Sequence, residues 1–138
     1  MGPDSAKGAL YAEYALLKVA SVFKTKFDNY AEESGVTTMP AFKFNFEGSI
    51  LGCLIASAGG GRSLPYYHFI ATPLLPCGQY DSPVKKYTGN GEVGPANNDM
   101  TKAIHAFAHF SAIYSQKMIV FCDLQGELQK VTLLRPVN

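Results

Sequence analysis

The sequence predicts an α+β fold in which a mainly antiparallel sheet is combined with two helices. Three observations lead to this prediction. An early segment repeats its apolar residues at helical spacing, several short segments of strand type follow it, and a second segment of helical spacing interrupts them. Strands and helices in this irregular order favour an α+β domain over a doubly wound parallel sheet, in which the two kinds of element alternate.

The first predicted element is a long amphipathic helix over residues 6–31 at the N-terminal end of the domain. Its apolar side chains recur at alternating spacings of four and three residues, which places them on one stripe of a helix. Gly35 lies just beyond the expected end. The members of the stripe are Leu16, Ala20, Phe23, Phe27 and Tyr30.

The residues after this helix have strand patterns. Phenylalanine alternates with polar residues between positions 42 and 46, and the chain is then continuously apolar from 51 to 55. We expect two strands there, joined near Glu47. A third strand is expected over residues 66–71, because the prolines that follow prevent its continuation.

The second half of the chain predicts a short strand, a helix and two further strands. Residues 84–88 have a strand pattern, and a loop rich in Gly, Pro and Asn then leads to Asp99, a candidate helix cap. Apolar residues between 100 and 114 share one helical face, so we expect a second helix that packs on the sheet. A compact apolar strand follows over residues 117–122, and a last strand over 131–134.

Length and composition are those of one globular domain that spans residues 1–138. The chain has 47% hydrophobic and 17% charged residues, and its net charge is +1. Such a charge provides no basic field for nucleic acid or anionic membranes. Because no apolar stretch reaches the roughly 20 residues that cross a bilayer, and no signal sequence is seen, we expect a cytoplasmic domain without nucleic-acid or membrane partners.

The cysteines and the glycine-rich segment are weak candidates for a site. Cys53, Cys77 and Cys122 are odd in number and widely separated. They therefore predict reduced thiols instead of a disulfide framework or a zinc site. Residues 59–62, Gly-Gly-Gly-Arg, lack the lysine of a phosphate-binding loop and the G-x-G-x-x-G order, so a turn between strands is the better interpretation.

Two motifs carry a resemblance to a known family. Residues 106–110 read A-F-A-H-F, and D-L-Q-G begins fourteen positions after the histidine (109 to 123), at the end of an apolar run. Together they resemble the most distinctive block of the alpha-kinases, atypical protein kinases of the myosin heavy chain kinase and elongation factor 2 kinase type. Residues 86–90, K-Y-T-G-N, are similar to a K-Y-N-N-N segment of that family. The resemblance implies a kinase-like α+β fold, in a divergent fungal-like member that is incomplete at both ends.

The resemblance also implies a function. A member of this family would be a serine/threonine kinase that transfers the γ-phosphate of ATP, with Mg²⁺, to a protein substrate. Asp123 would be the catalytic carboxylate that orients or deprotonates the substrate hydroxyl. Gln125 would help to hold nucleotide-bound magnesium, and Lys86 and Asn90 would also bind the nucleotide. Phosphoryl transfer asks a protein mainly for positioning and charge neutralisation, which suits these residue types.

On residue types alone, these same residues have plainer interpretations. An aspartate that ends a buried strand before a glycine turn is usually a turn-former. His105 and His109 stand four residues apart on one helical face, a spacing that can bind a metal, but no acidic or cysteine partner lies nearby. His105 is therefore expected to be structural. Lys85 and Lys86 are most often a solvated pair.

Several departures from the family pattern limit what the resemblance implies. His109 matches a histidine that binds structural zinc, but the H-x-C-x-x-x-C tail with the other ligands is absent, and a closed zinc site needs four ligands. Zinc is thus expected only with such a tail. Arg135 stands where the family has an aspartate before proline, and Thr72 replaces a hinge glutamate. The family's nucleotide-binding lysine precedes the long helix, so Lys43 does not replace it.

Three hypotheses remain open at this point. The first is an active kinase whose missing parts belong to a longer gene product. The second is a catalytically inactive pseudokinase or protein-interaction domain, which the residues at positions 72 and 135 favour. The third is an unrelated α+β binding protein that happens to contain D-L-Q-G. The substrate protein and the oligomeric state are not encoded in any recognisable pattern.

Overall fold

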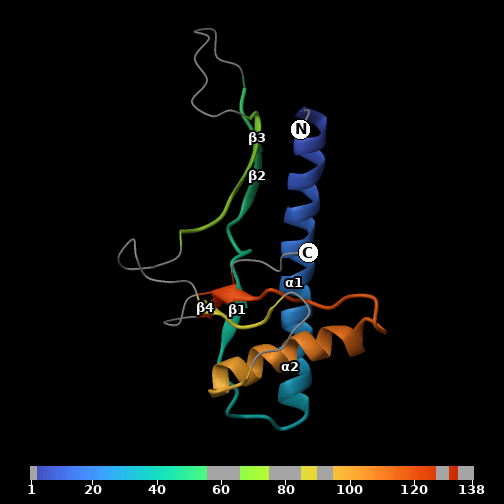
Figure 1. The fold of residues 1–138 in the computed structure, drawn as a ribbon, viewed down its shortest axis with the longest axis vertical. Coiled ribbons are helices and arrows are strands. Elements are labelled where there is room, and N and C mark those ends of the chain that lie inside the picture. The colour runs from blue at the N-terminus through green and yellow to red at the C-terminus, as the bar shows by residue number, and fades with distance from the viewer. Residues whose placement is uncertain (1–2, 56–65, 75–84, 90–94, 127–130, 134–138) are drawn as a thin grey trace.

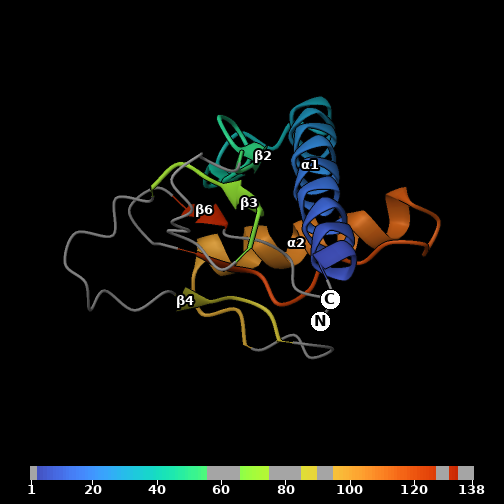
Figure 2. The same cartoon turned by 90° about the horizontal axis from the view of Figure 1, so that it is seen from above.

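A computed structural model describes residues 3–55, 66–74, 85–89, 95–126 and 131–133, and within them it has the α+β architecture that the sequence predicts. Figure 1 shows the long helix α1 standing beside the β2–β3 pair, while α2 crosses α1 near the C-terminal end of α1. Figure 2 shows the same crossing from above. Neither of these two described helices combines the length and the apolar character that crossing a membrane requires.

Helix α1 runs from Pro3 to Glu33, somewhat longer than predicted. Its buried face is shifted from the predicted stripe by about one residue: Ala20 and Phe27 are buried as expected, whereas Tyr30 is 60% exposed. The fully or nearly buried positions again follow alternating spacings of three and four. They are Leu17, Ala20, Lys24, Phe27 and Ala31.

The shift brings a lysine into the buried face of α1. Lys24 is only 6% exposed. Its ammonium forms an ion pair with Asp28 one turn later and lies 4.3 Å from the centre of the Phe42 ring. The carboxylate and the ring face replace part of the water that the charge loses, and the methylene stem adds apolar contact.

The six described strands form two sheets. The larger one has the order β1-β6-β5-β4, and β2 and β3 form a separate antiparallel pair. Of the four described pairings, only β1 with β6 is parallel, so the predicted mainly antiparallel character is confirmed. The strands are β1 (Phe42–Phe44), β2 (Ile50–Cys53), β3 (His68–Ala71), β4 (Lys85–Lys86), β5 (Gln125–Gly126) and β6 (Val131–Leu133).

Helix α2 spans Asp99–Tyr114, as expected, but its N-cap is the preceding residue. The side chain of Asn98 accepts a hydrogen bond of 2.8 Å from the Thr101 amide, so Asp99 is the first helical residue. An asparagine is as good a cap as an aspartate. Asp99 adds a negative charge in the first turn, where the helix dipole favours it.

The strand predicted over residues 117–122 is wrong. After α2 the chain turns through Gln116 and Lys117, which both have positive φ. The amide of residue 119 then donates to the hydroxyl of Ser115 at 2.8 Å, and that of residue 121 donates to Ser111 at 3.2 Å. Serine side chains of α2 and its C-cap thus take the place of a neighbouring strand; Phe121 is buried and Ile119 packs against the core, whereas Met118 and Val120 are exposed.

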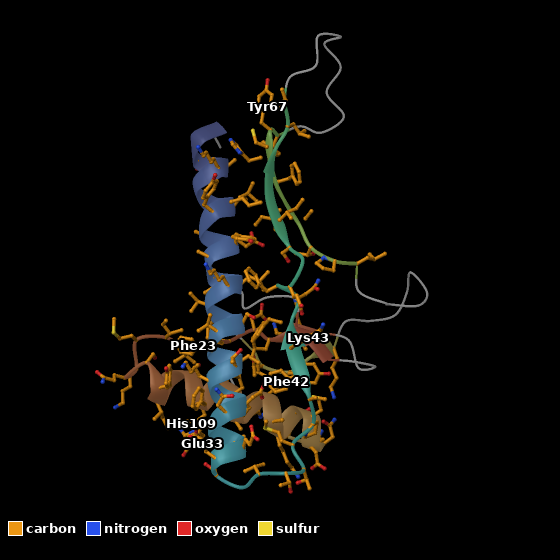
Figure 3. All side chains as sticks on the ribbon, turned by 180° about the vertical axis from the view of Figure 1, so that it is seen from behind. Phe23, Glu33, Phe42, Lys43, Tyr67 and His109 are labelled. Atoms are coloured by element: carbon orange, nitrogen blue, oxygen red, sulfur yellow. The ribbon has the colours of Figure 1, made fainter. Side chains whose placement is uncertain are left out.

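The core is a cluster of aromatic rings around Phe107 of α2, which is completely buried. The centre of its ring lies 5.4 to 5.9 Å from those of four other phenylalanines, and it stacks on Phe121. One of them, Phe42, lies on β1 beside α1 in Figure 3. The cluster thereby joins both helices, β1 and the segment after α2. The four partners of Phe107 are Phe27, Phe42, Phe44 and Phe121.

We expect Phe107→Ala to lower the free energy of unfolding by about 3–5 kcal/mol, because it removes contacts to four rings and leaves a cavity. Urea or thermal unfolding followed by circular dichroism measures this loss. Met118→Ala is the matched control: its side chain is 85% exposed, and the expected change is within about 0.5 kcal/mol. Equal losses in the two variants would contradict the assignment of the core.

Gly52 and Gly8 provide a second test with opposite signs. Gly52 on β2 lies opposite Phe69 on β3, and a Cβ atom added to it would lie 2.3 Å from the end of the Phe69 ring. Gly52→Ala therefore displaces the ring and is expected to cost about 1–3 kcal/mol. Gly8→Ala in α1 meets no atom within 4 Å and is expected to stabilise the helix by up to about 1 kcal/mol. Stabilisation by both substitutions would show that Phe69 does not cover Gly52.

Candidate functional site

Strands β4 and β5 bring together two of the sequence motifs. Lys85 pairs with Gly126, and Lys86 pairs with Gln125, in antiparallel register. The K-Y segment and the D-L-Q-G segment, far apart in sequence, are therefore adjacent. Lys86 and Gln125, both predicted as nucleotide-binding residues, lie directly opposite each other.

Asp123 lies at the turn that leads into β5. Its φ of 53° is in the left-handed region, where asparagine and aspartate are tolerated better than most other residues. Its amide donates to the carbonyl of Gly89 at 3.3 Å. Its carboxylate forms an ion pair with the ammonium of Lys86, so a third predicted site residue joins the other two.

The two partners of this ion pair differ in exposure. The side chain of Asp123 is 17% exposed, whereas that of Lys86 is 56% exposed. An ion pair with a solvent-exposed lysine contributes little to stability. The Lys86 ammonium thus lies largely in water, whereas the Asp123 side chain is mostly buried.

A group of buried hydrogen bonds holds the two motifs together behind Asp123. The Leu124 amide donates to the hydroxyl of Thr88 at 2.8 Å. The Leu124 carbonyl accepts from the amides of Tyr87 and Thr88, at 2.8 and 3.3 Å. Leu124 and Thr88 are both buried, at 0% and 4% exposure, so these bonds satisfy peptide groups that water does not reach.

His105 attaches this group to α2. Its Nε2 lies 2.8 Å from the carbonyl oxygen of Tyr87. A carbonyl oxygen only accepts, so the imidazole donates from Nε2. The structural role expected for His105 is confirmed, and its partner is the residue that follows Lys86.

Tyr87, the tyrosine of the K-Y segment, packs into the core. Its side chain is 4% exposed, and the Lys85 ammonium lies 5.1 Å from the centre of its ring. Burial raises the pKa of the Tyr87 hydroxyl above its ordinary value of 10.0, because the ionised form loses its hydration.

The other predicted residues lie away from this group or outside the described part of the chain. His109 is exposed on α2, where that helix crosses α1 in the view of Figure 3. Lys43 is exposed on β1, the strand at the opposite edge of the larger sheet from β4. Thr72 is exposed after β3. Asn90, Arg135 and residues 59–62 lie outside the described residues.

Magnesium and zinc differ in how well they fit these residues. Mg²⁺ in nucleotide sites takes one or two carboxylates together with phosphate oxygens. The Asp123 carboxylate and the Gln125 amide fit that role, and Lys86 adds a positive charge for phosphates. Within the described residues no three side chains of the His, Cys, Asp and Glu types gather as a metal site, so His109 has no partners there for a four-coordinate zinc.

Sequence reasoning did not identify Thr88. Thr88 belongs to the K-Y-T-G-N segment, but a threonine in a strand pattern is usually a packing residue. One feature of the sequence points to a role as hydrogen-bond acceptor. Thr88 stands where the K-Y-N-N-N segment of the family has asparagine, and both side chains offer an oxygen that accepts a hydrogen bond. The acceptor became meaningful only when the structure placed the Leu124 amide beside it.

Comparison with known proteins identifies one family. The model of the alpha-kinase family matches residues 6–137, which is nearly the whole chain. No curated protein and no solved structure matches it. The matched range includes every residue of the group around Asp123.

The raised pKa of Tyr87 predicts a loss of stability in alkaline solution. Below about pH 10 the hydroxyl is protonated in both the folded and the unfolded chain, so its contribution to the free energy of unfolding is fully present. Above that value the unfolded chain loses the proton first, and the free energy of unfolding falls as the pH rises through the pKa of the folded chain. We expect the free energy of unfolding to fall more steeply between pH 9 and pH 11 in the original chain than in Tyr87→Phe. For each protein, the fall is measured relative to its own free energy of unfolding at pH 7. Parallel curves would show that Tyr87 is not buried as described.

Proposed function

Because the chain belongs to the alpha-kinase family, we propose that it is a protein serine/threonine kinase that transfers the γ-phosphate of ATP to a protein hydroxyl. The observation that carries this proposal is the group formed by Lys86, Asp123 and Gln125. The Lys86 ammonium forms an ion pair with the Asp123 carboxylate, and Lys86 lies opposite Gln125 in the β4–β5 pair, so residues of two distant motifs are adjacent. Phosphoryl transfer needs these three kinds of group.

Each residue has a distinct role in the proposed reaction. Asp123 orients the substrate hydroxyl and accepts its proton while the hydroxyl oxygen bonds to the γ-phosphorus and the bridging oxygen leaves with ADP. Gln125 contributes an oxygen to the magnesium ion of the nucleotide, which neutralises phosphate charge. Lys86 turns from Asp123 towards the phosphates, which its exposure allows.

The surroundings of Asp123 support its proposed role. A general base must be held in place, and the carboxylate here is mostly buried on a backbone that is hydrogen-bonded to Gly89. Asn90, which follows Gly89 in sequence, is proposed as a further nucleotide contact on the resemblance alone. The remaining parts of the proposal are a protein substrate, ATP and Mg²⁺ as cofactors, and a cytoplasmic location.

A catalytically inactive interaction domain is the second candidate, and Thr72 favours it. The resemblance puts a glutamate at this hinge position. Threonine has no charge, and its side chain is exposed after β3. An inactive domain would keep the fold and the Lys86–Asp123 ion pair without transferring phosphate.

The test is the incorporation of labelled phosphate from ATP into a basic protein. We expect Asp123→Asn to reduce the rate at least about 100-fold, because the amide does not accept the proton, while asparagine still suits the left-handed backbone. Asp99→Asn is the matched control: it makes the same change at the exposed start of α2 and is expected to leave the rate near that of the original chain.

The outcomes separate the two candidates. Equal rates in the original chain and in Asp123→Asn would exclude Asp123 as the base. Binding of ATP without any transfer by the original chain would favour the inactive domain.

A further inference from the structure

We infer that Thr88 is a positioning residue, whose hydroxyl fixes the backbone that carries Asp123. This inference rests on the proposed function, because it concerns the same carboxylate. Thr88 has no place in the chemistry itself: its side chain is buried, and its hydroxyl oxygen accepts from the Leu124 amide instead of facing the ion pair.

The backbone of Asp123 departs from a regular strand conformation. Its positive φ turns the following peptide away from the direction that a regular strand would give it. The Leu124 amide is thereby directed to a side chain, while the Leu124 carbonyl still bonds to the backbone of residues 87 and 88. The hydroxyl of Thr88 supplies the acceptor that a strand carbonyl would otherwise provide.

The side chain of Thr88 holds its hydroxyl acceptor in a restricted position. Threonine is branched at Cβ, so its χ1 angle has few accessible values, and burial restricts it further. The same residue also donates its amide to the Leu124 carbonyl, at 3.3 Å. Thr88 therefore holds both sides of Leu124, the residue directly after Asp123.

The segment that contains Lys86, Tyr87 and Thr88 is attached to α2. His105 holds the carbonyl of Tyr87, which lies between Lys86 and Thr88. Lys86 and Asp123 are thus both next to residues whose peptide groups are fixed by buried hydrogen bonds. Loss of the Thr88 hydroxyl would free the Asp123 side of this arrangement and leave the Lys86 side attached.

Steady-state kinetics of the full chain test the inference. Thr88→Val keeps the shape of the side chain and removes the acceptor; we expect kcat to fall about 10- to 100-fold while KM for ATP stays near its original value, because the misplaced group acts on the chemical step. Thr88→Ser keeps the hydroxyl and is expected to restore most of kcat. A folded Thr88→Val protein with unchanged kcat, or one in which only KM rises, would overturn the inference.

Amide hydrogen exchange gives a readout that does not depend on kinase activity. In the original chain we expect the Leu124 amide to exchange as slowly as buried α2 amides such as that of Phe107. In Thr88→Val the Leu124 and Asp123 amides should exchange about tenfold faster or more, with Phe107 unchanged. If the original chain transfers no phosphate, slow exchange at Leu124 still supports the positioning role while the proposed function fails. Rapid exchange at Leu124 in the original chain overturns the inference without any variant.

Discussion

The burial of one ring, that of Phe107, is the constraint on which the rest of the structure depends. Its partners come from α1, from β1 and from the segment that follows α2. The last of these partners, Phe121, stacks on it only two residues before Asp123. The position of the candidate catalytic carboxylate is therefore set by packing in the core before any polar contact acts on it.

Polar contacts then determine the direction in which Asp123 points. A left-handed residue at the start of β5 interrupts the regular ladder, and an interrupted ladder leaves buried peptide groups that need partners. Side chains supply them at two places: Thr88 accepts from Leu124, and Ser111 accepts from Phe121. The chain between α2 and β5 is consequently fixed by hydroxyl groups as well as by rings.

The sequence predicted the elements better than it predicted their faces and ends. Helical spacing located α1 and α2, but the buried face of α1 includes Lys24, because a pattern of apolar residues does not count a lysine whose charge is met by Asp28 and an aromatic ring. The apolar segment before Asp123 was expected to be a strand. Alternate residues of this segment, Ile119 and Phe121, do pack inwards as in a strand, yet their amides bond to serines, and no hydrophobic pattern distinguishes these two cases.

In the candidate site, too, the sequence identified some residues and missed others. Motif resemblance identified Lys86, Asp123 and Gln125, and the structure connects Lys86 to the other two by an ion pair and by strand pairing. Thr88 and His105 act through backbone groups, and nothing in a single sequence shows which carbonyl or amide a side chain will meet.

The two charged partners differ in their contact with water. If both Lys86 and Asp123 were buried, separating them would leave two uncompensated charges away from water, and the pair would be a fixed structural element. The described exposure is unequal, so water stabilises the ammonium when it leaves, while the backbone of Asp123 keeps its hydrogen bond to Gly89. In the proposed reaction, the group that accepts a proton must stay in place, and the group that meets an incoming phosphate must be able to reach it. The buried hydrogen bonds around Leu124 lie on the side of the pair where rigidity is needed, and solvent lies on the side where movement is needed.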